Sequence, residues 1–191
     1  MPKHVPASLL KQFQTVGRDL FLQGLNSSHS GNLSIRKGEM VWITRRGAPL
    51  GRLKAADVVG VELRHPETMA RSASSELPSH LSIYGNGLAG AVVHAHPPGA
   101  IALSLSRDGI EPLDLEGSYH MPRVGVVAPQ GPYDPHRLAG PVGQALREVR
   151  VAVIRAHGTF SWGADLWEAF RWTSTLEHSC RILLLSRLDG P

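Results

Sequence analysis

Two histidines of this chain are spaced so that they can share one ligand. His94 and His96 flank a single alanine and stand directly before two prolines. Side chains two residues apart in a β-strand project from the same face, so both imidazoles can reach one point, and the prolines end the strand there. A third histidine, His157, stands at another predicted strand end, before Gly158, which permits a sharp turn. Three neutral imidazoles leave a divalent cation with its full charge and an open position, as in a catalytic zinc site.

Any metal must be held by histidine or carboxylate side chains. The single cysteine, Cys180, excludes both a cysteine-based zinc ribbon and an internal disulfide. The alternative interpretation is that some of the chain's 10 histidines, His157 among them, are ordinary core or surface residues.

A second cluster contains two serines, Ser74 and Ser75, at the predicted start of a helix that runs to about residue 86. Ser75 can cap this helix, and the free N–H groups of the first turn favour an anion. Glu76 is then either an ordinary acid, placed well for the helix dipole, or a catalytic base. His80 lies one turn later on the same side, and it either orients Glu76 or belongs to the helix surface.

A third cluster lies along a predicted hairpin. Gly31 and Gly47 allow a ligand close to the backbone, and Asn32 and Thr44 offer neutral hydrogen bonds. The guanidinium group of Arg46 can donate two parallel hydrogen bonds to a phosphate. Each of these is an ordinary hairpin or turn residue on its own, so their value lies in their occurrence together.

Strands and helices must position these clusters. An apolar stripe predicts a helix over residues 7–24, and alternating apolar residues predict a hairpin over 32–36 and 40–44. Further strands are predicted over 58–63, 91–96, 124–128, 151–156 and 159–162, and further helices over 98–106, 135–149 and 165–188. This mixture indicates a layered α/β or α+β domain whose strand order the pattern leaves open.

The composition is that of one globular domain. The 191 residues are 42% hydrophobic and 19% charged, which excludes wholesale disorder and suits a single core. The net charge of +4 comes from scattered basic residues, so we expect no nucleic-acid partner. No run approaches the ~20 apolar residues of a membrane span, and the N-terminus lacks the pattern of a signal peptide, so we expect a cytoplasmic protein.

Taken together, the clusters resemble those of the class II aldolase/adducin family. The resemblance extends from about residue 9 to residue 185, and the motifs that follow the family's order and spacing are Gly31-Asn32-Leu33-Ser34, Ile43-Thr44 with Gly47, Ser74-Ser75-Glu76, His94-Ala95-His96 and His157-Gly158. It implies one domain over residues 1–191, with αβα layers around a mostly antiparallel sheet flanked by helices. It also implies a homotetramer with active sites at subunit boundaries. Within the family, the pattern is nearest to the aldolases that cleave L-fuculose 1-phosphate.

The resemblance further implies a metal site and a phosphate site. Zinc, or manganese or another divalent ion in its place, would be held by the three histidines named above. The phosphate of a small phosphorylated sugar would lie among Asn32, Thr44, Gly47, Ser74 and Ser75.

Two features of the chain bear on how that pattern applies. Arg46, preceded by Arg45 where proline is common, stands where the family usually has a small hydroxyl residue. It either strengthens phosphate binding or indicates another anion, such as a carboxylate. A tyrosine from a neighbouring subunit assists the aldolases, and Tyr119 is our candidate for it, with Glu116 and His120 as alternative lining residues.

These implications predict a zinc-dependent aldolase. It would cleave a ketose phosphate to dihydroxyacetone phosphate and a small aldehyde through a metal-stabilised enediolate, with Glu76 moving a proton at the neighbouring carbon. The alternative is a dehydratase, 4-epimerase or decarboxylase of the same family with the same metal site. Glu76 favours an aldolase or a dehydratase, because the epimerase typically carries aspartate there. An adducin-like scaffold without catalysis predicts lost metal ligands, and their retention argues against it.

Overall fold

A mixed sheet forms the centre of the fold. The computed structural model describes residues 4–68 and 71–187, and its strands follow the order β3-β2-β1-β4-β8-β7-β6-β5. Neighbouring strands are antiparallel except β6 and β7, which are parallel. The strands are β1 (Asn32–Lys37), β2 (Met40–Thr44), β3 (Val58–Glu62), β4 (Ala91–Ala95), β5 (Gly109–Ile110), β6 (Val124–Val127), β7 (Val151–Ile154) and β8 (Gly158–Gly163).

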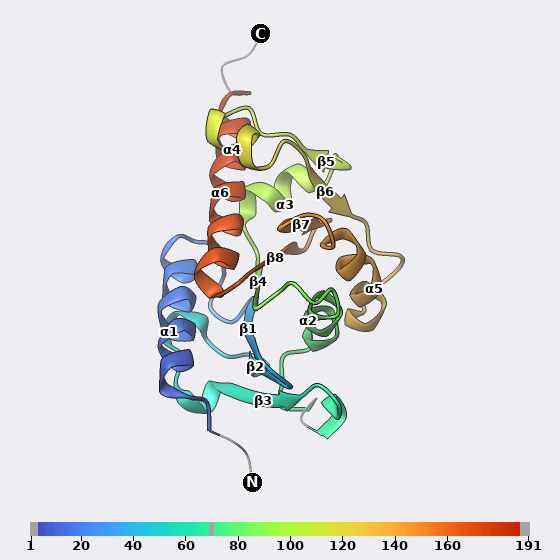
Figure 1. Cartoon of the computed structure of the whole chain (residues 1–191). Coiled ribbons are helices and arrows are strands. Elements are labelled where there is room, and N and C mark those ends of the chain that lie inside the picture. The colour runs from blue at the N-terminus through green and yellow to red at the C-terminus, as the bar shows by residue number, and fades with distance from the viewer. Residues whose placement is uncertain (1–3, 69–70, 188–191) are drawn as a thin grey trace.

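Helices cover both faces of this sheet. In Figure 1, α1 and α6 lie on one side, and α2 and α5 lie on the other. α3 packs against α6 and the adjoining strands, and α4 also contacts α6. The helices are α1 (Ala7–Leu22), α2 (Leu77–Tyr84), α3 (Pro98–Ser104), α4 (Leu115–His120), α5 (Pro135–Ala145) and α6 (Leu166–Leu185), with short 3-10 turns at Leu50–Arg52, Ala55–Asp57 and Pro66–Thr68.

The alternation of side chains along β1 shows how the sheet separates an apolar layer from the site. Leu33 and Ile35 point into the buried cluster that includes α1 and the start of α6. Asn32 and Ser34 point to the other face, where both bind His80 of α2. The expected αβα layering and mostly antiparallel sheet are therefore confirmed, and a polar row lies beneath α2.

Several predicted elements end earlier than their patterns suggest. α5 ends at Ala145 instead of residue 149, and beyond its end the carbonyl oxygens of Leu146 and Val149 accept the indole N–H of Trp162 at 2.9 and 2.8 Å. β7 also ends early, because Ala156 adopts a φ of 59°, which no strand continues. The sequence analysis missed β5 and α4, since elements this short carry no periodic signal.

Among the residues that the structure describes, no helix is both long and apolar enough to cross a bilayer.

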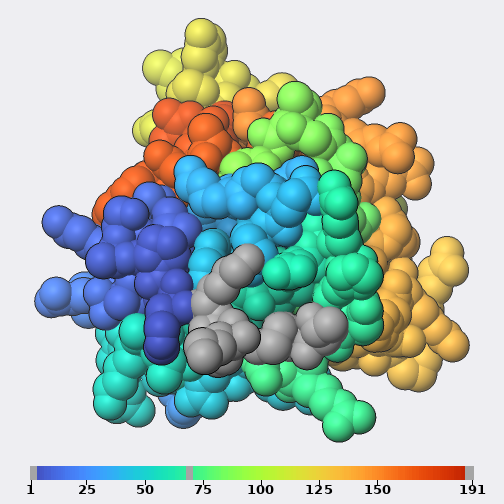
Figure 2. Space-filling view, turned by 60° about the horizontal axis from the view of Figure 1, so that its bottom comes forward, coloured from blue at the N-terminus to red at the C-terminus, as the bar shows by residue number. Residues whose placement is uncertain are grey.

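Figure 2 views the molecule from the end where β3 forms the edge of the sheet. α1 lies to one side of this view and the segment around α5 to the other, with the first three strands between them.

Candidate active site

The three histidines predicted from the sequence come together near the middle of the sheet. His94 lies in β4, opposite Asn32 of β1 and Phe160 of β8. His96 follows the same strand, and its Nε2 atom lies 3.0 Å from Nε2 of His94. His157 lies in the turn between β7 and β8, and the ligand atoms of the three histidines all lie within 4.8 Å of one another. We call this group the histidine triad.

Two members of the triad, His94 and His96, are neutral, and the backbone orients His94. Nδ1 of His94 lies 2.9 Å from the carbonyl oxygen of Thr159, so Nδ1–H donates there and Nε2 carries a lone pair. Burial holds the pKa of His94 well below its usual value and lowers the pKa of His96 to about 4, and the positive charge of a neighbouring imidazole would add to both effects. Neutral imidazole is the form that binds metals.

Unpaired atoms beside the triad fit a divalent cation. Nε2 of His157 is buried and has no hydrogen-bond partner among the described residues. One carboxylate oxygen of Glu76 lies 3.4 Å from it, and the other is buried without a partner in the same described set. Buried polar atoms are normally paired, so orphaned atoms beside converging imidazoles indicate a place that binds a cation. Three imidazoles without a thiolate suit zinc or a related divalent metal and leave a position for substrate.

The turn that carries His157 depends on a close backbone approach. A Cβ on Gly158 would lie 2.4 Å from the carbonyl oxygen of Ala95, and 3.2 Å from ring carbons of both His94 and His96. The sharp backbone conformation that we expected from Gly158 belongs instead to Ala156, whose N–H donates to the hydroxyl of a serine at the end of α3. Gly158 is required for packing against the triad, not for a positive φ.

A residue that the sequence analysis missed, Asn26, holds His96 in place. The side-chain oxygen of Asn26 accepts a hydrogen bond from the backbone N–H of His96 at 3.0 Å. Gly31 has a φ of 74°, and a Cβ there would lie 2.6 Å from both polar atoms of that side chain and 2.7 Å from the carbonyl oxygen of His94. The glycine of the first motif therefore allows Asn26 and β4 to approach each other.

Glu76 has the position of an acid or base at the triad. Its side chain is only 3% exposed, and its backbone N–H donates to the hydroxyl of Ser74 at 3.2 Å. The expectation that Ser75 caps α2 is wrong, because the N-terminal flanking residue is Glu76 and no side chain caps it. An isolated bridge pairs Ala73, the residue before Ser74, with Arg45.

Several of the predicted phosphate ligands adjoin one another. The backbone N–H of Ser74 donates to the carbonyl oxygen of Thr44 at 3.1 Å, which joins the two predicted loops. The hydroxyl of Thr44 accepts the N–H of Leu33 at 3.2 Å. A cavity of about 390 Å³ lies outside them, and among its lining residues are Arg46, Ser74, Ser75 and His136. Gly47 completes the turn with a φ of 69°.

The two adjacent arginines have different partners. Arg45 donates to Asp57 at 2.9 Å, and its charge helps to hold the pKa of that carboxyl below its usual value against the opposing effect of burial. Arg46 makes no ion pair with the described residues and borders the cavity next to Ser74. Arg46 is therefore the cation that can meet an anion there.

His80 does not orient Glu76, contrary to one of our two interpretations. Its ring nitrogens lie 2.5 Å from the side-chain oxygen of Asn32 and 2.6 Å from the hydroxyl of Ser34. His80 is fully buried, so the other interpretation, a role on the helix surface, is also wrong.

The tyrosine nearest the triad is not the predicted one. Tyr119 is 81% exposed, and its ring contacts His120, with centroids 5.0 Å apart. Within the described chain no contact joins either residue to the triad, so a role for Tyr119 in a neighbouring subunit stays a prediction, as does a lining role for Glu116. The ring of Tyr133, which the sequence analysis missed, lies 4.8 Å from that of His157. Nothing local distinguishes Tyr133 in its proline-rich loop.

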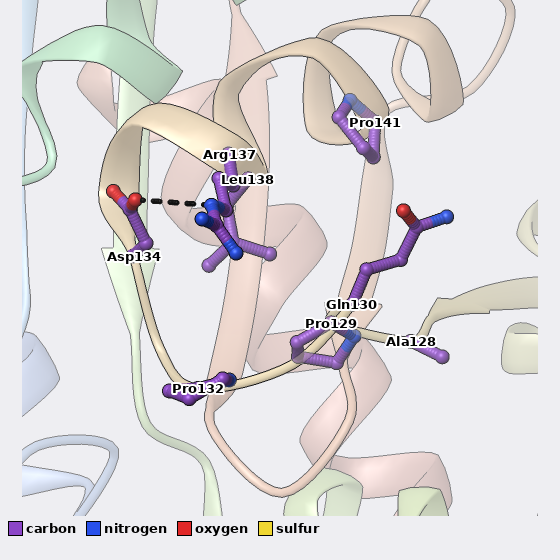
Figure 3. A pocket seen from close by; sticks show the side chains of 8 residues that line it. All are labelled: Ala128, Pro129, Gln130, Pro132, Asp134, Arg137, Leu138 and Pro141. Carbon is purple, nitrogen blue, oxygen red and sulfur yellow. Dashed lines mark ion pairs between the residues drawn. The ribbon is translucent and has the colours of Figure 1, made fainter.

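The loop of Tyr133 also borders a cavity of about 530 Å³ between β6 and α5, shown in Figure 3. Three prolines and the ion pair between Asp134 and Arg137, at 3.4 Å, lie along its wall. No member of the triad lines this cavity. It therefore lies beside the candidate site without being part of it.

Known proteins share this architecture. The chain matches the family model described as Class II Aldolase and Adducin N-terminal domain over residues 11–184. A methylthioribulose-1-phosphate dehydratase of Acidiphilium cryptum is 31% identical, over 91% of this chain and 88% of its own length. An L-fuculose phosphate aldolase of Methanocaldococcus jannaschii is 29% identical, over 93% of this chain and 97% of its own length.

A solved structure agrees with these relatives. The crystal structure of L-fuculose-1-phosphate aldolase from Thermus thermophilus superposes with a TM-score of 0.91 at 39% identity, and the match covers 97% of this chain and 99% of that chain. The family model and the structural match each extend over most of the chain, and the relatives are named as enzymes. The chain therefore belongs to the class II aldolase and adducin family and is an enzyme of the lyase type.

Proposed function

We propose that this enzyme is a metal-dependent aldolase that cleaves a ketose 1-phosphate of the L-fuculose 1-phosphate type into dihydroxyacetone phosphate and a small aldehyde. The observation that carries the proposal is the convergence of the histidine triad beside the buried carboxylate of Glu76, which lies 3.4 Å from Nε2 of His157. The triad would hold zinc or another divalent ion, which supplies Lewis-acid stabilisation of negative charge on substrate oxygens.

Glu76 moves the proton in this proposal. As the bond between C3 and C4 breaks, the C4 hydroxyl gives up its proton to water or a tyrosine and becomes the aldehyde carbonyl. The bonding electrons stay with C3, and Glu76 delivers a proton to that carbon. In the synthetic direction the same carboxylate removes a proton from C3 of dihydroxyacetone phosphate. Support comes from its burial and from its second oxygen, which has no partner among the described residues.

The phosphate is held beside this carboxylate by neutral donors and one cation. The hydroxyls of Thr44 and Ser74 each accept a backbone N–H, so the O–H of each remains available to donate. Arg46 and Ser75 border the adjoining cavity. We assign Asn32 and Gly47 to the same phosphate site, because Asn32 adjoins Leu33, whose N–H donates to the Thr44 hydroxyl, and Gly47 lies in the turn after Thr44.

Dehydration is the second candidate, since a dehydratase is among the relatives with at least 30% identity. The same base would remove a proton from C3, and departure of a hydroxyl from C4 would replace carbon–carbon cleavage. Both reactions use the triad and Glu76 in the same places, so product analysis must separate them.

The test is a panel of ketose phosphates and sugar-acid phosphates, incubated with the enzyme in the presence and absence of a chelator. We expect triose phosphate to appear from a ketose 1-phosphate and to disappear with the chelator. A dehydrated, epimerised or decarboxylated product without triose phosphate would contradict the aldolase proposal.

Glu76→Gln is the matched variant, because it keeps the shape of the side chain and removes its base. We expect metal content to survive and turnover to fall by about 100-fold or more. Turnover equal to that of the wild type would remove Glu76 from the proton transfer. The cytoplasmic location and the homotetramer stay predictions, which fractionation and light scattering of the purified protein would test.

A further inference from the structure

A buried line of polar side chains leads from the core to the proposed phosphate site. The hydroxyl oxygens of Tyr84 and Ser34 lie 2.7 Å apart, and the same Ser34 oxygen lies 2.6 Å from Nδ1 of His80. Nε2 of His80 then lies 2.5 Å from the side-chain oxygen of Asn32. Tyr84, Ser34 and His80 are at most 1% exposed, and Asn32 is 6% exposed. This line links two residues of α2, Tyr84 and His80, to Asn32, which we assign to the phosphate site.

The chemistry of the four groups gives the line one direction. Burial lowers the pKa of His80 to about 3, so the ring is neutral and carries one N–H. The direction starts at Tyr84, because the buried Tyr84 O–H has the hydroxyl oxygen of Ser34 as its one partner among the described residues and therefore donates to it. The O–H of Ser34 then donates to Nδ1 of His80, which leaves the N–H of the ring on Nε2. That N–H needs an acceptor, so the atom of Asn32 that it meets is the amide oxygen. Every donor in the line has one acceptor.

We propose that His80, held by Ser34 and Tyr84, is a positioning residue that turns the carboxamide of Asn32 so that its NH2 group faces the substrate phosphate. This inference rests on the proposed function, because it concerns the same phosphate. No described residue accepts a hydrogen bond from the Asn32 nitrogen. With the amide reversed, its NH2 would meet Nε2–H of His80, and two donors would face each other at 2.5 Å in a buried place.

The packing holds this arrangement rigidly. Asn32 and Ser34 lie two residues apart in β1 and so share the face beneath α2. Phe160 packs its ring edge-on against the ring of His80, with centroids 5.7 Å apart and planes at 77°. The ring of Phe160 also stacks on the ring of His94, with centroids 4.3 Å apart. Phe160 therefore contacts both His80, which holds the proposed phosphate-binding residue Asn32, and a member of the triad.

The consequence concerns the form of the ligand. The oxygens of Asn32, Thr44 and Ser74 all accept hydrogen bonds from the protein itself. What these three residues still have available for a ligand is an N–H or an O–H. Such a set fits the acceptor-only oxygens of a fully ionised phosphate better than a hydroxyl group, which must also donate.

The test measures the affinity of the full chain for inorganic phosphate by calorimetry, with its metal and again after chelation. His80→Phe keeps the buried ring and removes both nitrogens, so we expect phosphate to bind about tenfold more weakly. His80→Gln keeps a donor near Nε2, and we expect it to restore most of the affinity. Ser34→Ala removes one oxygen only, and a several-fold loss is expected even if His80→Phe does not fold.

Two controls separate positioning from general damage. Ile83→Val removes one buried methylene-sized group from the same helix, so it should lower stability without changing phosphate affinity. The loss in His80→Phe should not exceed that in Asn32→Ala, since His80 acts through that one side chain.

The outcomes distinguish this inference from the function on which it rests. A wild type that does not bind phosphate overturns the phosphate site and this inference together. A wild type that binds phosphate, with unchanged affinity in both His80→Phe and Ser34→Ala, overturns only the role of His80. A loss in His80→Gln as large as that in His80→Phe also overturns it, because retention of the donor would then make no difference.

Discussion

The burial of His80 makes the free energy of unfolding depend on pH, and His80→Gln should remove this contribution. Burial lowers the pKa of this imidazole from 6.5 to about 3, whereas in the unfolded chain it is exposed and keeps a pKa of about 6.5. Below that value the unfolded chain binds a proton that the folded chain does not bind. The free energy of unfolding therefore falls as the pH falls from about 6.5 toward 3.

The size of this effect follows from the same two pKa values. Between about pH 8 and about pH 5, the linkage relation gives a loss of about 2 kcal/mol from His80 alone. Above about pH 7 its contribution to the pH dependence is small, because the imidazole is then mostly neutral in both states.

Urea unfolding of the wild type and His80→Gln measures this loss. Both proteins are treated with a chelator, so that metal release at low pH does not contribute, and both are unfolded at several pH values between about 8 and 5. The other histidines titrate in both proteins, and the difference between the two curves isolates His80. We expect the variant to lose about 2 kcal/mol less than the wild type over this range. Parallel curves would refute the assignment of a neutral, desolvated His80.

Three further predictions concern the surroundings of the triad. Gly158→Ala places a Cβ 2.4 Å from the carbonyl oxygen of Ala95. We expect urea unfolding to show a free energy of unfolding lower by about 1 to 3 kcal/mol, and we expect the purified variant to contain less zinc. A full zinc content would contradict the packing argument. Glu177→Ala leaves two backbone N–H groups at the start of α3 without their acceptor and should cost about 3 kcal/mol in the same assay. Glu177→Gln keeps one acceptor oxygen and should cost less, and equal losses would argue against this role. Removal of the metal should lower the midpoint of thermal unfolding, and zinc at about 100 times its Kd should raise the free energy of unfolding by about 2.7 kcal/mol. His94→Ala should abolish this stabilisation by zinc. Unchanged stabilisation in the variant would show that zinc binds elsewhere.

The convergence of the three histidines could be predicted from the sequence because its main signal is local. The pair His94 and His96 depends only on the alternation of side chains along one strand and on the prolines that follow it. The third histidine, His157, needed a strand end and the family pattern, and the structure brings all three together. The layered fold could be predicted for the same reason, since each strand and helix has its own apolar period.

The contacts of the site could not be predicted, because they depend on how distant elements lie on one another. His80 and Asn32 are 48 residues apart in sequence, and they meet only because α2 crosses the face of β1. Asn26 is 70 residues from the backbone N–H that it accepts. Tyr133 lies in a loop whose course follows from the packing of β6 and α5. The start of α2 also differs from the prediction, since no side chain caps it and the Ser74 hydroxyl accepts the N–H of Glu76.

The loop of Tyr133 differs in kind from the rest of the site. The groups to which we assign ligand binding and proton transfer come from β1, β4, the residue before α2 and the turn after β7. Tyr133 touches His157 from a connection that is about half exposed. We therefore expect substitutions of Tyr133 to alter the border of the proposed site at little cost in stability, because this half-exposed side chain lies outside the buried layers.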